Sequence, residues 1–168
     1  MSTAKTLFGY IVALLEHHTP IKITGDSLDD IYNHLPIDEH LSTSGQPSEP
    51  QFARMQSAGY KTVINLAPSS FIENSLADEE AVVTGLGMRY VHIPVNFNNP
   101  REQEFDRFVE VMQVSVGEKT WVHCAANARV SAFVFKYRRD VLGEDPALAA
   151  EDLRRIWEPM GVWKSFLD

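Results

Sequence analysis

The chain lacks several features that define whole classes of protein. It has one cysteine among 168 residues, so no intrachain disulfide can form and folding needs no oxidising compartment. No apolar run reaches the roughly 18 residues of a membrane span, and the apolar stretch over 7–15 lacks a small-residue cleavage site. Basic residues are few, 15 against 23 acidic ones, for a net charge of -8. We therefore expect a cytoplasmic protein that binds neither nucleic acid nor membranes.

The sequence also contains no pattern typical of a metal site or a cofactor site. The histidines show no zinc-ligand spacing on a common element, so we expect no metal site, and no residue pattern indicates a cofactor. These histidines are His17, His18, His34, His40, His92 and His123. We expect His123 to orient its neighbours through backbone hydrogen bonds. The sequence leaves the oligomeric state open.

Strand and helix patterns alternate along most of the chain. Short β-branched or apolar strands are predicted over 41–44, 61–66, 89–93 and 120–123. Predicted helices separate them, with Ser48, Asn99 and Asp145 as N-caps. This alternation predicts an α/β fold of three layers, with a parallel-dominated sheet of four or five strands. Residues 1–40 are expected to form an N-terminal helix (3–17) and an arm packed on the domain formed by residues 41–168.

The cysteine lies where a predicted strand gives way to a predicted helix. Helix N-terminal N–H groups lack partners and the dipole there is positive, so a thiolate is favoured at Cys124 and an oxyanion can be held. Arg129 adds planar donors suited to such an anion, and the Ser131 hydroxyl can donate to the sulfur. Asn127 tolerates a left-handed backbone better than most residues. This setting favours a functional cysteine over a small buried hydrophobe. The predicted backbone donors are those of Ala125, Ala126, Asn127, Ala128 and Val130.

The loop resembles the His-Cys-x5-Arg-Ser/Thr motif of the cysteine-dependent protein tyrosine and dual-specificity phosphatases. Residues 42–47, 58–66 and 90–95 are similar to a bacterial subgroup that includes beta-lactamase-hydrolase-like phosphatase domains, and the resemblance covers about residues 40–160. It implies a protein-tyrosine-phosphatase-like fold and hydrolysis of a phosphorylated substrate through a phosphocysteine on Cys124. Arg129 would bind the phosphoryl oxygens, and Ser131 would assist release of the thiolate.

Two positions depart from the family pattern. Arg129 follows Cys124 by five positions rather than six, so either Val130 occupies the arginine position or the loop is one residue shorter. The family's general acid, an aspartate, corresponds to Asn96, and an amide cannot protonate a leaving group. Glu102, Asp106 or an aspartate of residues 26–30 could supply a carboxylate, although we expect the first two to be solvated helix positions.

Three functions remain open from the sequence. The first is a cysteine-dependent phosphatase whose activity is weak or absent, because the arginine is shifted and the acid is missing. The second is a rhodanese-like sulfurtransferase carrying a persulfide on Cys124, which a shorter loop would suit. The third is a non-catalytic module that binds phosphate or sulfate. Lys136, Arg138 and Arg139, on the helix after the loop, are expected to be solvated.

Overall fold

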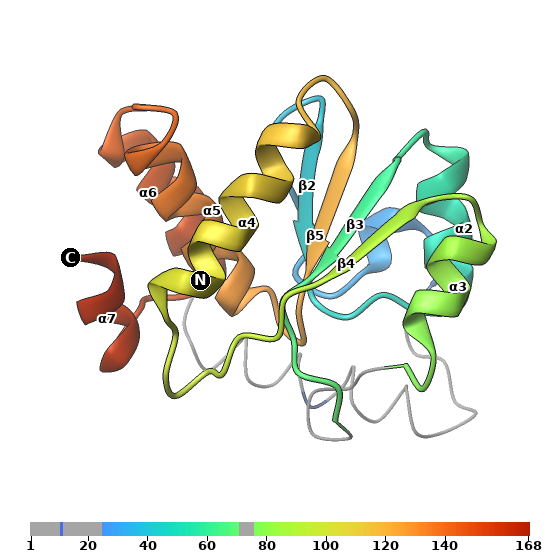
Figure 1. The fold of residues 1–168 in the computed structure, drawn as a ribbon, viewed down its shortest axis with the longest axis horizontal. Coiled ribbons are helices and arrows are strands. Elements are labelled where there is room, and N and C mark those ends of the chain that lie inside the picture. Colours follow the sequence, from blue (N-terminus) through green and yellow to red (C-terminus); the bar gives the residue numbers. More distant parts are fainter. Residues whose placement is uncertain (1–10, 12–24, 71–75) are drawn as a thin grey trace.

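The computed structural model describes residue 11 and residues 25–70 and 76–168, so the helix expected over 3–17 lies outside the described residues. Its centre is one five-stranded mixed sheet in the order β1-β2-β5-β3-β4 (Figure 1). All neighbours are parallel except β1 and β2. The predicted three-layer fold with a parallel-dominated sheet is confirmed. The strands are β1 (Leu35–Pro36), β2 (Leu41–Ser44), β3 (Thr62–Asn65), β4 (Arg89–His92) and β5 (Thr120–His123).

The edge strand β1 comes from the N-terminal arm. Leu35 pairs with Thr43 and Pro36 with Ser42, antiparallel to β2. A proline lacks the N–H that a central strand would need, so an edge suits it. A short 3-10 helix, η1 (Leu28–Asp30), precedes this strand. Residues 25–40 therefore contribute directly to the sheet of the domain.

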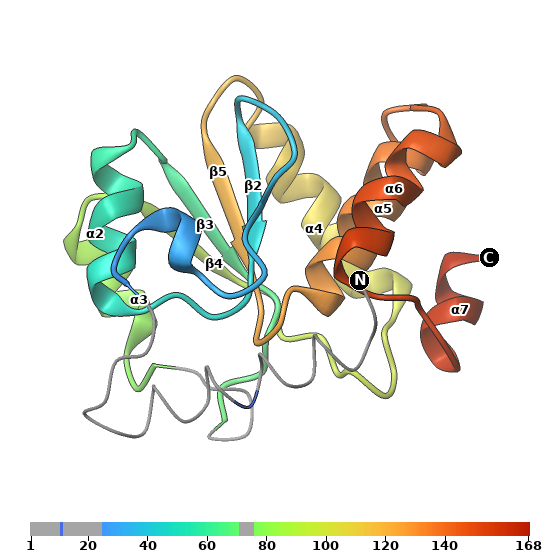
Figure 2. The same cartoon turned by 180° about the vertical axis from the view of Figure 1, so that it is seen from behind.

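Helices cover both faces of the sheet (Figure 2). One face carries α2 (Glu49–Ser57) and α3 (Glu79–Gly85), and the other carries four further helices of the described residues. These four are α4 (Glu102–Val114), α5 (Ala128–Asp140), α6 (Pro146–Ile156) and α7 (Val162–Leu167). No helix in the described parts of the chain is both long and apolar enough to cross a membrane.

Two of the three predicted helix caps are confirmed. Ser48 forms a capping box with Gln51, and the Asp145 carboxylate accepts from the Ala147 N–H. The prediction for Asn99 is wrong, because α4 begins two residues later, after Arg101. The Arg101 N–H donates to Glu104 at 3.0 Å, so the helix is capped from its own first turn rather than by an asparagine.

The central strand β5 separates two hydrophobic cores. Trp121 packs on one face with Phe52, whereas Val122 packs on the other with Phe108 and Phe133. Alternate side chains of a strand point to opposite faces, so burial on both sides leaves every residue of β5 buried. Because β5 is packed on both of its faces, the starting position of the segment that follows it is fixed.

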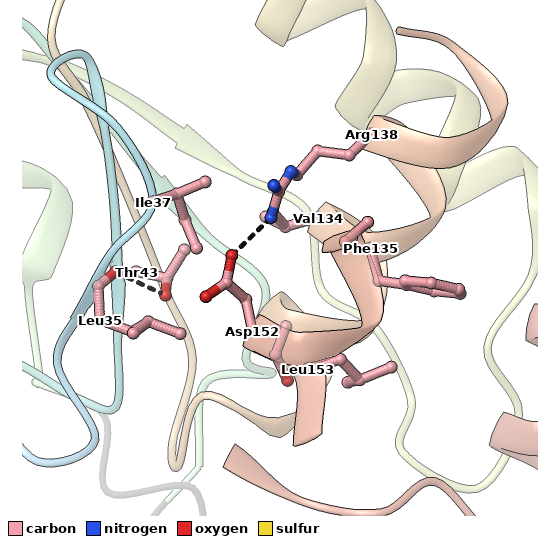
Figure 3. Close-up of a pocket in the computed structure, with 10 residues that line it drawn as sticks. Leu35, Ile37, Thr43, Val134, Phe135, Arg138, Asp152 and Leu153 are labelled. Atoms are coloured by element: carbon pink, nitrogen blue, oxygen red, sulfur yellow. Dashed lines mark hydrogen bonds and ion pairs between the residues drawn. The ribbon is translucent and has the colours of Figure 1, made fainter. Parts of the chain in front are cut away.

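The expectation of a solvated side chain is wrong for Lys136, which is 13% exposed, and equally for Arg138. The Arg138 side chain is only 13% exposed and lies 2.6 Å from Asp152 of α6 and 2.8 Å from Glu144. Figure 3 shows the Arg138–Asp152 pair beside a small pocket between the β1–β2 edge and helices α5 and α6. The pocket volume, about 10 Å³, leaves room for about one water molecule. Arg138 thus ties α6 to α5.

Candidate active site

Cys124 directly follows β5, and three residues separate it from the start of α5. Its N–H donates to the Ser44 carbonyl at 3.3 Å, which extends the parallel pairing of β5 with β2 beyond the strand end. The residue is only 1% exposed. The carboxyl ends of β2, β3 and β5 meet here, and such edges are where ligands bind in open α/β sheets.

The loop backbone turns some of its carbonyls toward the surrounding protein. The Ala125 carbonyl accepts from the Gln46 N–H at 3.3 Å, and the Ala126 carbonyl accepts from Asn33 Nδ2 at 3.0 Å. A trans peptide directs its N–H opposite to its carbonyl, so the Ala126 N–H points away from the turn at Gln46. Within the described residues, the N–H groups of Ala125 and Ala128 donate to no hydrogen-bond acceptor. These donors are available to an anion.

Asn127 has the left-handed backbone that the sequence predicted, with φ 64° and ψ 2°. It is the N-cap of α5 and is fully buried. Its side-chain amide donates to the Asn33 carbonyl at 2.8 Å and to Thr43 Oγ1 at 3.0 Å. The loop is therefore held in its turn by two segments remote in sequence.

Arg129 and Val130 point to different surroundings. The Val130 side chain is fully buried in the core beneath α5, so it packs where an anion-binding side chain could not lie. The Arg129 guanidinium carbon lies 5.3 Å from the ring centroid of Phe97, in the segment that follows β4. Arg129 is 4% exposed. A cation held over a ring face is attracted by its quadrupole, so Phe97 restricts where the guanidinium lies.

The other predicted site residues are engaged nearby. The Ser131 hydroxyl donates to the Ala128 carbonyl at 3.0 Å, so assistance to the sulfur would require this hydroxyl to rotate. Asn96 is exposed, and its Oδ1 accepts from the Asn98 N–H at 2.9 Å. Glu102 Oε1 lies 3.4 Å from Lys136 Nζ, and the Glu102 side chain is exposed, as expected for a solvated helix position. The roles proposed for Ser131 and Asn96 stay predictions.

A buried network that sequence reasoning missed lies behind the cysteine. His123 Nε2 is 2.9 Å from Glu79 Oε1, and both side chains are almost completely buried. Gln46 Nε2 donates to the other carboxylate oxygen at 2.6 Å, and Asn65 Nδ2 donates to Oε1 at 2.9 Å. His123 is thus oriented by a carboxylate rather than through the backbone hydrogen bonds that we expected.

The electrostatics of this network favour an ionised Glu79. Burial alone would raise the pKa of Glu79, but the charge of His123 and hydrogen bonds from His123, Gln46 and Tyr90 outweigh it and lower that pKa. Burial and the nearby carboxylate raise the pKa of Tyr90, which keeps its phenol protonated. The only sequence signal for Glu79 was its place in the first turn of a helix, where acidic residues are common.

The C-terminal aromatic residues connect two parts of the site. Trp163 Nε1 donates to the Phe97 carbonyl at 2.8 Å, and Trp157 Nε1 donates to the Ala128 carbonyl at 3.1 Å. The ring centroid of Phe97 lies 5.7 Å from that of Trp157 and 5.4 Å from that of Trp163. These contacts fix the segment after β4 against the start of α5. In the part of the chain that the structure describes, no three metal-ligating side chains gather as a metal site would require.

Comparison with known proteins places this geometry among phosphatases. Residues 21–158 match the family described as DSP-PTPase phosphatase fused to NAD+ kinase. A crystal structure described as "Putative phosphatase (DUF442)" from Shewanella putrefaciens CN-32 is 33% identical, with a TM-score of 0.73 over 83% of this chain and 91% of that one. The structure of TpbA from P. aeruginosa is 21% identical, with a TM-score of 0.60 over 73% and 72% of the two chains, and shows the shared fold.

A curated relative shares part of its length with this chain. The beta-lactamase hydrolase-like protein of Xylella fastidiosa strain Temecula1 is 30% identical over 95 residues, which are 55% of this chain and 22% of that protein. The chain therefore matches about a fifth of that relative's length. The similarity agrees with the bacterial subgroup that the sequence resembles.

Proposed function

Since the chain belongs to the family of DSP-PTPase phosphatase domains described with a fused NAD+ kinase, we propose that it hydrolyses phosphomonoesters through Cys124. The observation that carries the proposal is the place of the sulfur, between the carboxyl end of β5 and the N-terminus of α5. Among the described residues, no hydrogen-bond acceptor faces the N–H groups of Ala125 and Ala128 in the loop that follows it. A thiolate and a bound phosphoryl group are both favoured at such a helix N-terminus.

The reaction has two steps. The Cys124 thiolate attacks phosphorus, an S–P bond forms, and the P–O bond to the leaving group breaks. Water then attacks phosphorus, the S–P bond breaks, and inorganic phosphate and the thiolate are released. Backbone N–H groups of residues 125–130 and the Arg129 guanidinium would stabilise the negative charge on the phosphoryl oxygens. No metal or cofactor is needed in this scheme.

The leaving group decides how fast the first step is. With Asn96 at the general-acid position, the departing oxygen takes its proton from water. General acid catalysis contributes about 10²–10⁴-fold, so its loss is severe for an alkoxide and mild for a phenolate that is stable as an anion. We expect slow turnover of p-nitrophenyl phosphate and almost none of an alkyl phosphate.

The experiment compares wild type with Cys124→Ser on p-nitrophenyl phosphate and on glycerol phosphate. Turnover of the aryl ester that is lost in the variant and blocked by vanadate supports the phosphatase. If no phosphate ester is hydrolysed but thiosulfate is consumed to give a cyanide-labile sulfur on Cys124, the protein is a sulfurtransferase. If neither reaction occurs and phosphate only raises the melting temperature, the site is a binding module.

A further inference from the structure

Two left-handed asparagines meet at the cysteine loop. Asn33 and Asn127 are the non-glycine residues with positive φ among the described parts of the chain, at 52° and 64°. Asn127 Nδ2 donates to the Asn33 carbonyl at 2.8 Å, and Asn33 Nδ2 donates to the Ala126 carbonyl at 3.0 Å. Such backbone conformations are uncommon outside glycine and tend to gather at functional sites. Here hydrogen bonds join the segments of these two residues across the loop and stabilise both backbone conformations.

The contact between these segments is close along the backbone. The Gly45 N–H donates to the Tyr32 carbonyl at 2.7 Å. A Cβ at Gly45 would lie only 2.9 Å from both the Ala125 and the Tyr32 carbonyl oxygens. Glycine at this position therefore allows three backbone segments, around residues 32, 45 and 125, to meet without a side chain between them.

The segment that carries Asn33 has its own anchors. Ile31 is 3% exposed and belongs to the core that contains Phe52 and Trp121. The His34 ring stacks on Trp121, with a centroid distance of 4.8 Å and an interplanar angle of 16°. Both neighbours of the Tyr32–Asn33 pair are thus fixed by packing that does not involve the cysteine loop. The packing of Ile31 and His34 therefore fixes the position of Asn33 beside the cysteine loop.

We propose that Asn33 is a positioning residue for the anion-binding loop, an inference that rests on the proposed function. By accepting from Asn127 and donating to Ala126, it holds the Ala126 carbonyl outward and Asn127 in its left-handed turn. Without Asn33, the loop would also populate conformations in which a carbonyl oxygen points to the place of the oxyanion. Such conformations cannot bind an oxyanion, because the carbonyl oxygen repels it. The segment that carries Asn33, which precedes β2 in the chain, would then be part of the site rather than an accessory arm.

The test is the affinity for inorganic phosphate of wild type and of the Asn33→Gly variant. Glycine adopts a positive φ without strain, so this change removes the side-chain donor and leaves the backbone acceptor. One lost hydrogen bond corresponds to about a two- to tenfold change in equilibrium. We expect phosphate binding, measured by calorimetry, to weaken by about that factor.

Asp38→Ala is the matched control. Asp38 Oδ1 accepts from the His40 and Leu41 N–H groups at 2.7 and 2.8 Å, in the same β1–β2 region, and neither of these bonds involves the cysteine loop. This variant should lose stability while its phosphate affinity stays unchanged. Equal affinities in wild type and Asn33→Gly, or equal losses in both variants, would overturn the assignment.

Hydrogen exchange separates this inference from the proposed function. In the absence of any anion, Asn33→Gly should raise the exchange rate of backbone amides in residues 124–131 about two- to tenfold, and Asp38→Ala should not. If wild type binds no phosphate but this difference appears, the proposed function fails and the positioning role stands. If exchange in the loop is the same in all three proteins, the positioning role is refuted.

Discussion

Replacement of Glu79 by alanine tests the buried network behind Cys124. Glu79 accepts hydrogen bonds from Gln46 Nε2 at 2.6 Å and from Asn65 Nδ2 and His123 Nε2 at 2.9 Å. Alanine leaves these three buried donors without their acceptor. A buried donor left without its acceptor costs about 1–3 kcal/mol, and the loss of three at one site, after partial relaxation, comes to about 3–5 kcal/mol. For a domain of this size, 1 kcal/mol corresponds to about 2–4 °C, so we expect the melting temperature to fall by about 6–20 °C.

Glu80→Ala is the control on the same helix. Glu80 is exposed and lies one position further into α3, so it shares the favourable helix N-terminus but not the network. Its replacement should lower the melting temperature by no more than about 2 °C, because surface changes of this kind stay near 0.5 kcal/mol. Circular dichroism melts of the three proteins at pH 7 provide the measurement. Equal melting temperatures for the two variants would refute the account of the network.

The pH dependence carries a definite sign. The folded-state pKa of Glu79 lies below the ordinary value of 4.5, because the donors around the carboxylate outweigh the cost of its burial. Its contribution to stability is therefore fully present above pH 4.5 and is lost as the pH falls through the folded-state pKa. The difference in free energy of unfolding between wild type and Glu79→Gln should shrink below pH 4.5. A difference that grew on acidification would contradict the direction of the shift.

Three further predictions concern the loop and its surroundings. Asn96→Asp should raise turnover of an alkyl phosphate by up to about 10²-fold and add an acidic limb to its pH–rate profile; no gain would make the shifted arginine the larger defect. Arg129→Ala should reduce the rise in melting temperature caused by sulfate, whereas Arg107→Ala, on an exposed face of α4, should not. Trp163→Phe should cost about 1–3 kcal/mol by leaving the Phe97 carbonyl without its donor, as urea unfolding would report; an unchanged midpoint would rule out that role for the hydrogen bond.

The sequence predicted features that depend on local patterns. The strand 120–123, the cysteine after it and the left-handed Asn127 follow from side-chain types within a few residues. The caps at Ser48 and Asp145 were predictable for the same reason, since a cap acts on the next three residues. Local chemistry was thus sufficient for most elements and for the position of the candidate nucleophile.

The parts that were missed depend on contacts between remote segments. Asn33 and Asn127 are 94 positions apart, and Glu79 and His123 are 44 apart. No periodicity links such pairs, because their meeting depends on strand order rather than on spacing. Arg138 was misjudged for the same reason: its partner Asp152 lies on the next helix, which a pattern along one helix cannot show.

The central claim is that the Cys124 sulfur forms a covalent bond to phosphorus. Wild-type protein should be mixed with p-nitrophenyl phosphate, quenched in acid within the first turnovers and analysed by mass spectrometry of the peptide that contains residues 122–131. The account predicts one added phosphoryl group on Cys124, together with a burst of p-nitrophenol, and neither in Cys124→Ser. Release of p-nitrophenol at the wild-type rate from Cys124→Ser, or a phosphoryl group on another residue of the wild type, would contradict it.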